Sequence, residues 1–494
     1  MTRIPNGRPP QGRCAVALLV TCAALSSCSS AYPIAELEDP NTCKQCHPRH
    51  FEQWSGSMHA YAADDPVFVA MNRRGQREAQ LGSFCVQCHA PMAVLNHPDQ
   101  DFATFDPETL PPSERGITCY FCHNVESVHS DHNNGLFLAR DQTMRGGVKD
   151  PIDTPAHYSR YDDTLMAGNS KNNASAMCGS CHDVITPAGV HLERTFSEWK
   201  STIFASSDPA ASLSCARCHM TPAKDVIADG PGLAVVARDF GFHDHGFPAI
   251  DQALTSFPGA DAQTAGIAAI LNPALAIVSP RPPGGGNPPG GICLIPPDKL
   301  SVRIDTFNDG HNFPSGAAHD RRSWVEVVAY AADGSVLFSS GVVPEGMDPE
   351  DLHDDIIDCV DGNPVSFRCS GFWDRARKAD GSPARFFWDV ASETGFALKP
   401  PVTLDPNSPT FDHSTTVVYS VGAAWPQIDR ITARVLTQPL PHALLRDLMA
   451  SGDLDPSFVR PLPRLQGTGA TKTWNKATAG TGASVNTKCN YEPL

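Results

Sequence analysis

What this 494-residue sequence has little of excludes several classes of protein. Lysine and arginine total 38 against 54 aspartates and glutamates, so the formal net charge is −16. Such a chain lacks the basic stripe of a nucleic-acid-binding protein, and we expect no nucleic-acid partner. Aromatic residues make up only 8%. After residue 25, no apolar run reaches the roughly 18 residues that a membrane-spanning helix needs.

Four residue types are abundant instead. Glycine (38) and proline (44) indicate much loop structure. Apolar residues reach 41%, which excludes a chain that is disordered throughout. The 17 cysteines and 19 histidines are the unusual counts, and their positions carry most of the information.

Residues 1–27 have the pattern of an export signal. Three arginines in the first 13 residues precede the apolar stretch 14–25, which is too short to span a membrane as a mature helix. The tetrapeptide Leu-Ser-Ser-Cys at 25–28 resembles a bacterial lipobox, in which Cys28 would be lipidated and become the mature N-terminus. The alternative is an ordinary signal peptide cut nearby. Either interpretation predicts an exported protein, periplasmic or anchored to the outer membrane, with the face of the membrane left open.

Ten of the other cysteines form five Cys-x-x-Cys-His units, numbered 1 to 5 in chain order. Two thiols three positions apart lie on about one helical turn and can form thioethers with the two haem vinyl groups. The next residue then places its imidazole on the iron. The pattern predicts five haems c attached through Cys43, Cys46, Cys85, Cys88, Cys119, Cys122, Cys178, Cys181, Cys215 and Cys218. The predicted proximal iron ligands are His47, His89, His123, His182 and His219.

Zinc sites and disulfides explain this pattern less well. A zinc ribbon needs two Cys-x-x-Cys units per metal, and five is an odd number. Neither zinc nor a disulfide requires a histidine after every second cysteine. The haem units lie between residues 33 and 251, where short Gly- and Pro-rich segments cannot form a large aliphatic core. We therefore expect a pentahaem domain at 28–251, made mostly of short α-helices and loops wrapped on haems.

Five irons also have five distal positions. Fourteen histidines remain beside the proximal five, so the sequence can supply a histidine to every iron. His50 directly follows unit 1 and is too close to its own proximal ligand to cap that haem. Methionine is the competing ligand and would raise the potential. The methionines that compete are Met58, Met92, Met166 and Met220.

Several strings resemble a known family. These are "CKQCHPRHFEQWSGSMHA", "GITCYFCHNV", "CGSCHDVITPAGVHLERTFSEWKST", "CARCHMTP" and "GHNFPSG" followed by "RRSWVEVVAYAADG". They resemble the exported multihaem cytochromes c, and more narrowly the group around the tetrahaem cytochrome of ammonia oxidisers and hydroxylamine oxidoreductase. The resemblance covers roughly residues 40–345.

In such proteins, histidines in Trp-x-x-Ser-x-His and Gly-His-x-Phe-Pro-x-Gly strings commonly serve as distal ligands. Carried over, the resemblance implies His59 and His311 as distal ligands, then His245, with His157 and His132 completing the set. It brings no active site with it. The chain has no Cys-x-x-Cys-Lys unit of the nitrite reductase type, and it has five haem units where hydroxylamine oxidoreductase has eight.

The composition changes after the haem units. Residues 252–291 are first Ala-rich and then read "SPRPPGGGNPPGG", which predicts a linker. The remainder, 292–494, predicts a β-rich domain resembling a small antiparallel β-sandwich, with a short helix near its end and a mostly irregular tail from about residue 467. Strands are expected at 300–308, 385–391, 414–424 and 430–437, with a hairpin at 323–341 that turns at Asp333-Gly334.

Four cysteines lie in this second half, and export makes disulfides their expected state. Three pairings are possible. We favour Cys359–Cys369 as a local loop closure, which leaves Cys293–Cys489 to tie the tail to the start of the domain.

Two functions fit these features. Electron transfer through closely packed haems needs only six-coordinate irons, and the histidine count allows that for all five. A reductase or oxidase of a small nitrogen or sulfur compound needs one iron with an open position. A third possibility is a docking or polymerising β half, with the haems as a wire between chains. We predict an electron carrier whose partners are other redox proteins, cytochromes among them, with a lipid anchor to the membrane. If His311 ligates a haem, the β half is fixed to the haem half.

Overall fold

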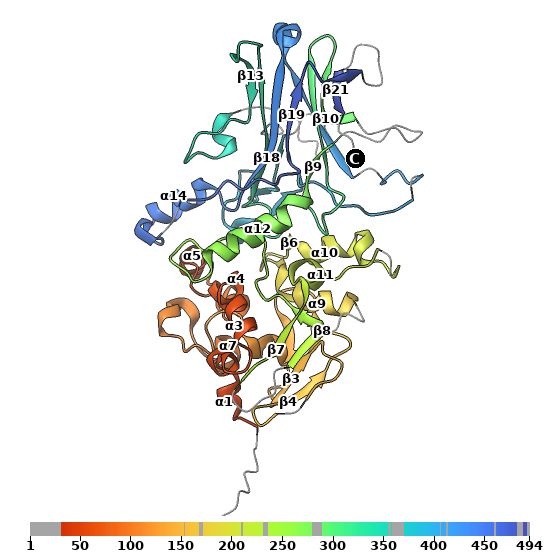
Figure 1. The fold of residues 1–494 in the computed structure, drawn as a ribbon. Coiled ribbons are helices and arrows are strands. Elements are labelled where there is room, and N and C mark those ends of the chain that lie inside the picture. Colours follow the sequence, from red (N-terminus) through yellow and green to blue (C-terminus); the bar gives the residue numbers. More distant parts are fainter. Residues whose placement is uncertain are drawn as a thin grey trace, which may run out of the picture.

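The computed structural model of the protein describes most of the chain. The described residues are 31–152, 154–166, 171–208, 211–230, 236–278, 289–353, 357, 370–405, 407–411, 413–458, 461–481 and 488–491. The chain forms an elongated molecule, with short helices and hairpins at one end and long strands at the other (Figure 1).

The N-terminal half is built from short helices. Their starts are fixed by local side chains: the Asp39 carboxylate accepts from the Asn41 amide at 2.9 Å, and the Thr118 hydroxyl accepts from the Phe121 amide at 3.4 Å. The helical elements are α1 (Ile34–Leu37), α2 (Pro40–Lys44), α3 (Pro48–Ser55), α4 (Met58–Tyr61), α5 (Pro66–Ala79), α6 (Val86–His89), α7 (Pro91–Asn96), η1 (Phe102–Thr104), η2 (Pro107–Thr109), α8 (Cys119–His123), α9 (Lys171–His182), α10 (Thr195–Lys200), η3 (Ile203–Ala205) and α11 (Cys215–His219).

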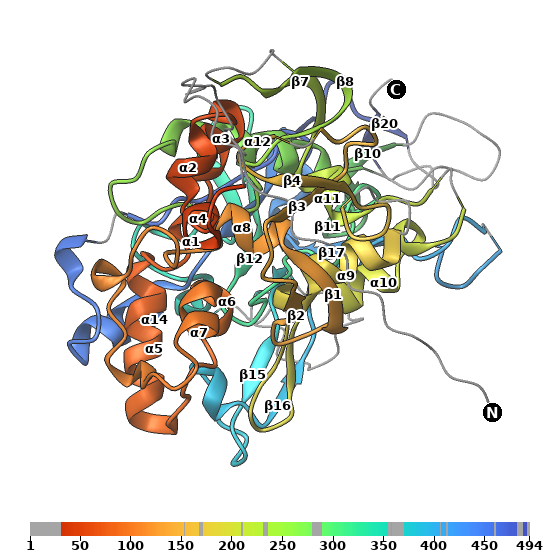
Figure 2. The ribbon, with the colours of Figure 1, turned by 90° about the horizontal axis from the view of Figure 1, so that it is seen from below.

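Four two-stranded ladders connect these helices. The β3–β4 pair is parallel and the other three are antiparallel. The strands are β1 (Val125–Ser130), β2 (Gly135–Leu138), β3 (Thr143–Gly146), β4 (Tyr158–Tyr161), β5 (Asp183–Ile185), β6 (His191–Arg194), β7 (Pro222–Ala228) and β8 (Val236–His243). Viewed from below, α1–α7 lie on one side and α9–α11 on the other, with β1–β4 between them (Figure 2).

The segment 252–291, predicted to be a linker, contains regular structure. Helix α12 (Ala260–Ala274) and the short strand β9 (Ala276–Ile277) lie within it, and β10 (Pro289–Ile295) begins at its end. The helix forms because this stretch is rich in alanine, the residue with the strongest helix preference. The Pro- and Gly-rich part at 279–288 lies outside the described residues.

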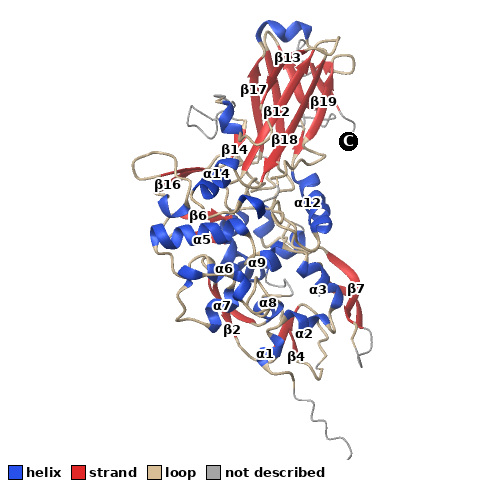
Figure 3. Ribbon diagram, turned by 90° about the vertical axis from the view of Figure 1, so that its left-hand side faces the viewer, coloured by secondary structure: helices blue, strands red, loops and turns tan. Residues whose placement is uncertain are grey.

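Two antiparallel sheets dominate the C-terminal half (Figure 3). One has the strand order β17-β11-β10-β21-β20, with β9 beside β11, and the other has the order β13-β12-β18-β19, with β14 beside β12. The remaining elements of this half are β11 (Lys299–Asp305), β12 (Arg322–Tyr330), β13 (Val336–Ser340), η4 (Pro349–Leu352), β14 (Gly371–Phe372), β15 (Arg375–Arg377), η5 (Phe387–Asp389), β16 (Ser392–Thr394), β17 (Ser414–Ser420), η6 (Gly422–Gln427), β18 (Arg430–Gln438), α14 (His442–Ala450), η7 (Pro456–Phe458), β19 (Thr471–Asn475), β20 (Gly480–Thr481) and β21 (Lys488–Tyr491).

Both sheets contribute to one buried apolar cluster. Val302 and Val417 from the first sheet and Val327 and Ala433 from the second are each at most 1% exposed. Alternating buried and outward residues along β12 and β18 place one face of each strand in this cluster. The two sheets therefore share a core. In the N-terminal half, by contrast, the buried apolar residues form several smaller clusters.

Most of the predicted strands are present, but two expectations are wrong. The hairpin turns at Asp333-Gly334 as predicted, where Gly334 has φ +85°, a conformation that glycine adopts without strain. The segment 385–391 is not a strand: it contains η5, and Phe386 is buried in a cluster with α5 and α14. The tail, predicted to be mostly irregular, has most of its described residues in β19, β20 and β21, each of which joins one of the two sheets.

Ion pairs and apolar contacts join the two halves. The Arg321 guanidinium donates to both carboxylate oxygens of Asp251, at 2.6 and 2.8 Å. Leu444 and Leu448 of α14 pack in one buried cluster with Val67 and Ala70 of α5. Because these contacts are buried, the C-terminal sheets are held against the haem units rather than tethered to them.

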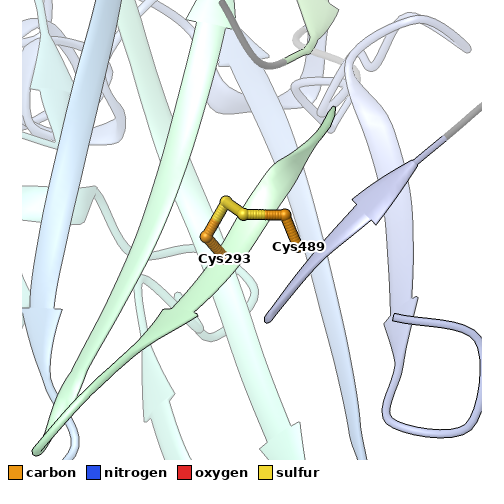
Figure 4. The surroundings of a disulfide bond; sticks show 2 residues. All are labelled: Cys293 and Cys489. Carbon is orange, nitrogen blue, oxygen red and sulfur yellow. A yellow bond between two sulfur atoms is a disulfide. The ribbon is translucent and has the colours of Figure 1, made fainter. Parts of the chain in front are cut away.

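A disulfide links the strands at the two ends of the C-terminal half (Figure 4). The sulfurs of Cys293 in β10 and Cys489 in β21 are 2.09 Å apart, and the two residues are register partners on neighbouring antiparallel strands. The other predicted pair, Cys359–Cys369, lies outside the described residues, as do the export segment and Cys28. Among the residues that the structure describes, no helix has the length and apolar character needed to cross a membrane.

Candidate haem sites

Four of the five predicted proximal histidines each have a backbone carbonyl beside the ring nitrogen Nδ1. A ring Nδ1 lies 2.7 Å from the Ile227 carbonyl for His47, 2.9 Å from Ala62 for His89, 2.6 Å from Arg145 for His123 and 2.8 Å from Pro248 for His219. A carbonyl can only accept a hydrogen bond, so Nδ1 carries the proton and Nε2 keeps its lone pair. Metal-ligating histidines usually have this arrangement, in which the second nitrogen is fixed by a carbonyl or carboxylate.

Four proximal histidines each face a second histidine ring. The pairs are His47 with His157 (centroids 6.2 Å apart), His123 with His245 (6.2 Å), His219 with His311 (6.2 Å) and His182 with His59 (6.1 Å). The ring planes are inclined by 27°, 19° and 11° in the first three pairs and by 65° in the fourth.

This spacing is the one that a shared metal requires. A metal–imidazole bond is about 2.0 Å long, and the ring centroid lies about 1.1 Å beyond the nitrogen, so two rings on opposite sides of one iron have centroids about 6.2 Å apart. Aromatic rings in direct contact also have centroids roughly 4.5–7 Å apart, so the distance carries weight only together with the identity of the residues: each of the four pairs joins the histidine of an attachment unit to a histidine far from it in the sequence. The four pairs thus fit the two axial positions of haem iron.

The local backbone also fixes the distal rings. Nδ1 of His157 donates to the Tyr158 carbonyl (3.0 Å), that of His245 to the His243 carbonyl (2.7 Å) and that of His311 to the Asn312 carbonyl (2.8 Å). In each case Nε2 remains for the metal, as on the proximal side.

His59 is held by the segment that leads into unit 3. The Ser57 hydroxyl caps α4 by accepting from the Ala60 amide at 3.3 Å, and the Ile117 amide donates to the His59 carbonyl at 3.0 Å. Gly116, with φ +74°, lies so close that a Cβ there would be 2.7 Å from the His59 carbonyl oxygen. The indole of Trp54 donates to the Ile117 carbonyl at 2.7 Å. The Trp-x-x-Ser-x-His string therefore packs His59 against the start of unit 3.

Burial keeps these imidazoles neutral, which ligation requires. Loss of hydration lowers the pKa of His59 to about 3, of His245 to about 3 and of His219 to about 4, with neighbouring histidines lowering it further. Burial also lowers the pKa of His47 and His182. All five rings are ligand-competent at neutral pH.

Unit 2 differs from the other four. Within the described part of the chain, no second histidine ring forms such a pair with His89. Its ring instead stacks on Phe68, with centroids 4.0 Å apart and planes inclined by 1°. Phe68 lies beside the imidazole face rather than opposite Nε2, so it fixes the ring orientation without supplying a ligand.

His132, the fifth distal ligand implied by the resemblance, lies in the turn between β1 and β2. Its Nδ1 is 3.1 Å from the Ser130 hydroxyl and 3.3 Å from the Asp131 carboxylate, and its side chain is 38% exposed. Unlike the other four, it is not brought to a proximal histidine. His97, the histidine nearest unit 2 on its C-terminal side, is bonded to Glu114 instead, at 3.1 Å.

Contacts between cysteine thiols link the units to one another. The thiols of Cys43 and Cys119 lie close enough to lower the pKa of one and raise that of the other, which places units 1 and 3 side by side. Unit 4 is connected to unit 2 and to unit 5 in the same way, through Cys181–Cys88 and Cys178–Cys215. Cys122 of unit 3 also lies near enough to Cys178 and Cys181 to raise the pKa of their thiols. Groups attached to these sulfurs would be neighbours in the order 1–3–4–5, with unit 2 beside unit 4.

Two features of these sites have no signal in the sequence. The backbone carbonyls that accept from Nδ1 belong to residues of no special type, so only the fold reveals them. His50 also has a place in the fold that its position after unit 1 did not indicate. Its ring lies 4.8 Å from that of His245 and 6.0 Å from that of His47, and its buried Nδ1 has no hydrogen-bond partner among protein atoms. The residues present therefore fit haem, and this orphaned nitrogen suits a polar group at a porphyrin edge.

Comparisons with known proteins agree with this chemistry. Residues 42–124, which contain the first three units, match the family described as cytochrome c554 and c-prime. The fold is similar to the crystal structure of a penta-heme cytochrome c552 from Thermochromatium tepidum, with 17% sequence identity, a TM-score of 0.57 and coverage of 90% of this chain and 100% of that chain. A search of curated protein sequences finds no match.

The family match, the shared fold and the attachment units together support a multihaem cytochrome c. Within that class, the attachment units and the family match support covalently bound haem c.

Proposed function

We propose that the protein is an exported five-haem cytochrome that carries electrons between redox partners. The observation that carries the proposal is the common 6.1–6.2 Å spacing of four histidine pairs. A histidine on each side fills both axial positions of an iron and leaves no place for a substrate. Four of the five units are thus built for electron transfer alone.

The order of the thiol contacts supports a route for the electrons. Units 1, 3, 4 and 5 form a series, and its end members have the more accessible attachment sites. Cys218 of unit 5 is exposed, and the Cys46 thiol of unit 1 is less buried than its partner Cys43. We therefore place electron entry and exit at units 1 and 5.

The location and partners follow from charge and the leader. Removing residues 1–27 deletes three arginines and no acids, which changes the formal charge from −16 to −19. A surface this acidic favours docking to a basic patch on a partner such as another cytochrome, with salt-sensitive rates. The Leu-Ser-Ser-Cys tetrapeptide supports lipidation at Cys28, and Ser29 after it supports retention on the outer membrane.

A second function is favoured by unit 2 alone. His89 has its Nδ1 bonded to a carbonyl, as a proximal ligand should, yet no histidine faces its Nε2 among the described residues. An iron held there would keep one axial position for a small molecule. Because unit 2 is next to unit 4, electrons could reach that molecule from the main series. The protein would then be an oxidoreductase of a small nitrogen or sulfur compound.

Electron paramagnetic resonance of the oxidised protein, with carbon monoxide titration of the reduced protein, tests both proposals. We expect four low-spin haems and one haem that binds carbon monoxide. Five low-spin haems without carbon monoxide binding would support the electron carrier and exclude the oxidoreductase. High-spin signals from two or more haems would overturn the histidine assignments.

A further inference from the structure

The distal histidine of unit 5 comes from the C-terminal half of the chain. His311 lies in the connection between β11 and β12, and its ring faces His219 of α11. Unit 5 is therefore complete only when this connection is held against the haem half. The residue that holds it is found on α10.

The carboxylate of Glu198 in α10 accepts three hydrogen bonds from the connection between β11 and β12. It accepts from the Asn312 side-chain amide at 2.7 Å, from the Asn312 backbone amide at 3.3 Å and from the Ser315 hydroxyl at 2.6 Å. Glu198 is only 9% exposed. Hydrogen bonds to a buried carboxylate are among the stronger ones in proteins, because the acceptor is charged and water is excluded.

Asn312 connects these hydrogen bonds to His311, the proposed distal ligand. The His311 ring donates from Nδ1 to the carbonyl of Asn312 at 2.8 Å. Asn312 is therefore bonded to Glu198 on one side and orients the imidazole on the other. If Asn312 shifts, the carbonyl that sets the direction of Nε2 shifts with it.

Glu198 also lies next to an arginine that pairs with the C-terminal half. Its Oε1 lies 3.9 Å from the Arg194 guanidinium, which also pairs with Asp374 and Glu393. Thr195, one turn earlier on α10, receives the Gly316 amide at 3.0 Å. Arg194 therefore holds the Glu198 carboxylate from one side, while the connection that carries His311 bonds to it from the other.

We propose that Glu198 is a positioning residue for the distal ligand of unit 5, acting through Asn312 on His311. The inference rests on the proposed function, in which His219 and His311 ligate one haem. It adds a means by which the C-terminal half controls one end of the proposed electron route, because the contacts at Glu198 decide whether unit 5 is six-coordinate.

Glu198→Gln is the first test. The amide keeps the size of the side chain but turns an NH2 group toward donors, so the Asn312 and Ser315 bonds cannot all form. Three histidine pairs have nearly parallel rings, and we expect the low-spin electron paramagnetic resonance signal of one of them to decrease. Carbon monoxide binding should rise by up to one haem per chain. Glu198→Asp retains the carboxylate and should lose less of the signal. Lys200→Gln changes an exposed residue of the same helix and should change neither readout.

His311→Ala and Asn312→Ala complete the design. If His311→Ala and either Glu198→Gln or Asn312→Ala affect the same haem, the positioning role is supported. If His311→Ala affects one haem while both other variants leave it low-spin, the positioning role is overturned and the proposed function stands. If His311→Ala changes no haem, the ligand assignment in the proposed function fails. Asn312→Ala decides the matter should Glu198→Gln not retain its haems, since it leaves the buried carboxylate in place.

Discussion

Replacing His59 with alanine tests the ligand assignments most sharply, because its pair has a distinct geometry. The His59 and His182 rings are inclined by 65°, whereas the other three pairs are inclined by 27° or less. Two iron d orbitals can interact with the imidazole rings. Nearly parallel rings interact with the same one of the two and separate its energy from that of the other. Steeply inclined rings act on both orbitals and cancel that separation. The His59 haem should therefore give the most anisotropic low-spin signal.

The expected magnitude follows from the number of pairs. Four pairs predict four low-spin haems, so His59→Ala should remove one quarter of the low-spin intensity, all of it from the anisotropic signal. If unit 2 is the single haem without a distal histidine, high-spin intensity and carbon monoxide binding should both double. Added imidazole should restore the lost signal, because alanine leaves room for a free ring where the His59 side chain was.

The assay is electron paramagnetic resonance with spin quantification, on the wild type and on two variants. His97→Ala is the matched control, because His97 is half-exposed and bonded to Glu114 rather than facing a proximal ring. Loss of a near-parallel signal instead of the anisotropic one would show that the pairing is misassigned. An unchanged spectrum in His59→Ala would refute the use of ring spacing to find axial ligands.

Three further predictions concern composition and stability. A pyridine haemochrome assay should give five haems per chain, none extractable with acidified organic solvent, and a ratio near three would contradict the five attachment units. The Cys293–Cys489 bridge closes 196 residues, so replacing both cysteines with serine should lower the free energy of unfolding by up to about 5 kcal/mol in a guanidinium titration; an unchanged midpoint would argue against a stabilising role. Burial raises the pKa of Glu193 to about 7 despite the opposing Arg321. The folded state therefore holds this proton more tightly than the unfolded state, and stability should fall by up to about 3 kcal/mol as pH rises from 4.5 to 7. Glu193→Gln should flatten that part of the pH–stability curve. An equally steep curve in the variant would show that Glu193 is not the source of the pH dependence.

The sequence alone determined the features that depend on neighbouring residues. Two thiols and an imidazole in five consecutive positions are enough to define haem attachment, because one helical turn brings them together. The turn at Asp333-Gly334 was predictable for the same reason, since a glycine with positive φ sets the hairpin by itself. The sequence also singled out His59, His157, His245 and His311, the four histidines that the structure pairs with histidines of the attachment units, but it did so from a resemblance to known strings rather than from physical reasoning about the residues.

The tertiary structure alone decided which histidines meet. His311 is 92 positions from His219, and His59 precedes His182 by 123, so no local pattern links either pair. Their distances depend on how loops and helices pack, as does the placement of Glu198 beside Asn312. Packing also explains the wrong strand prediction at 385–391. This apolar segment has a strand-like composition, yet Phe386 packs against α5 and α14, and the segment contains a turn of 3₁₀ helix. Composition states what a segment can bury, but the rest of the fold decides where it is buried.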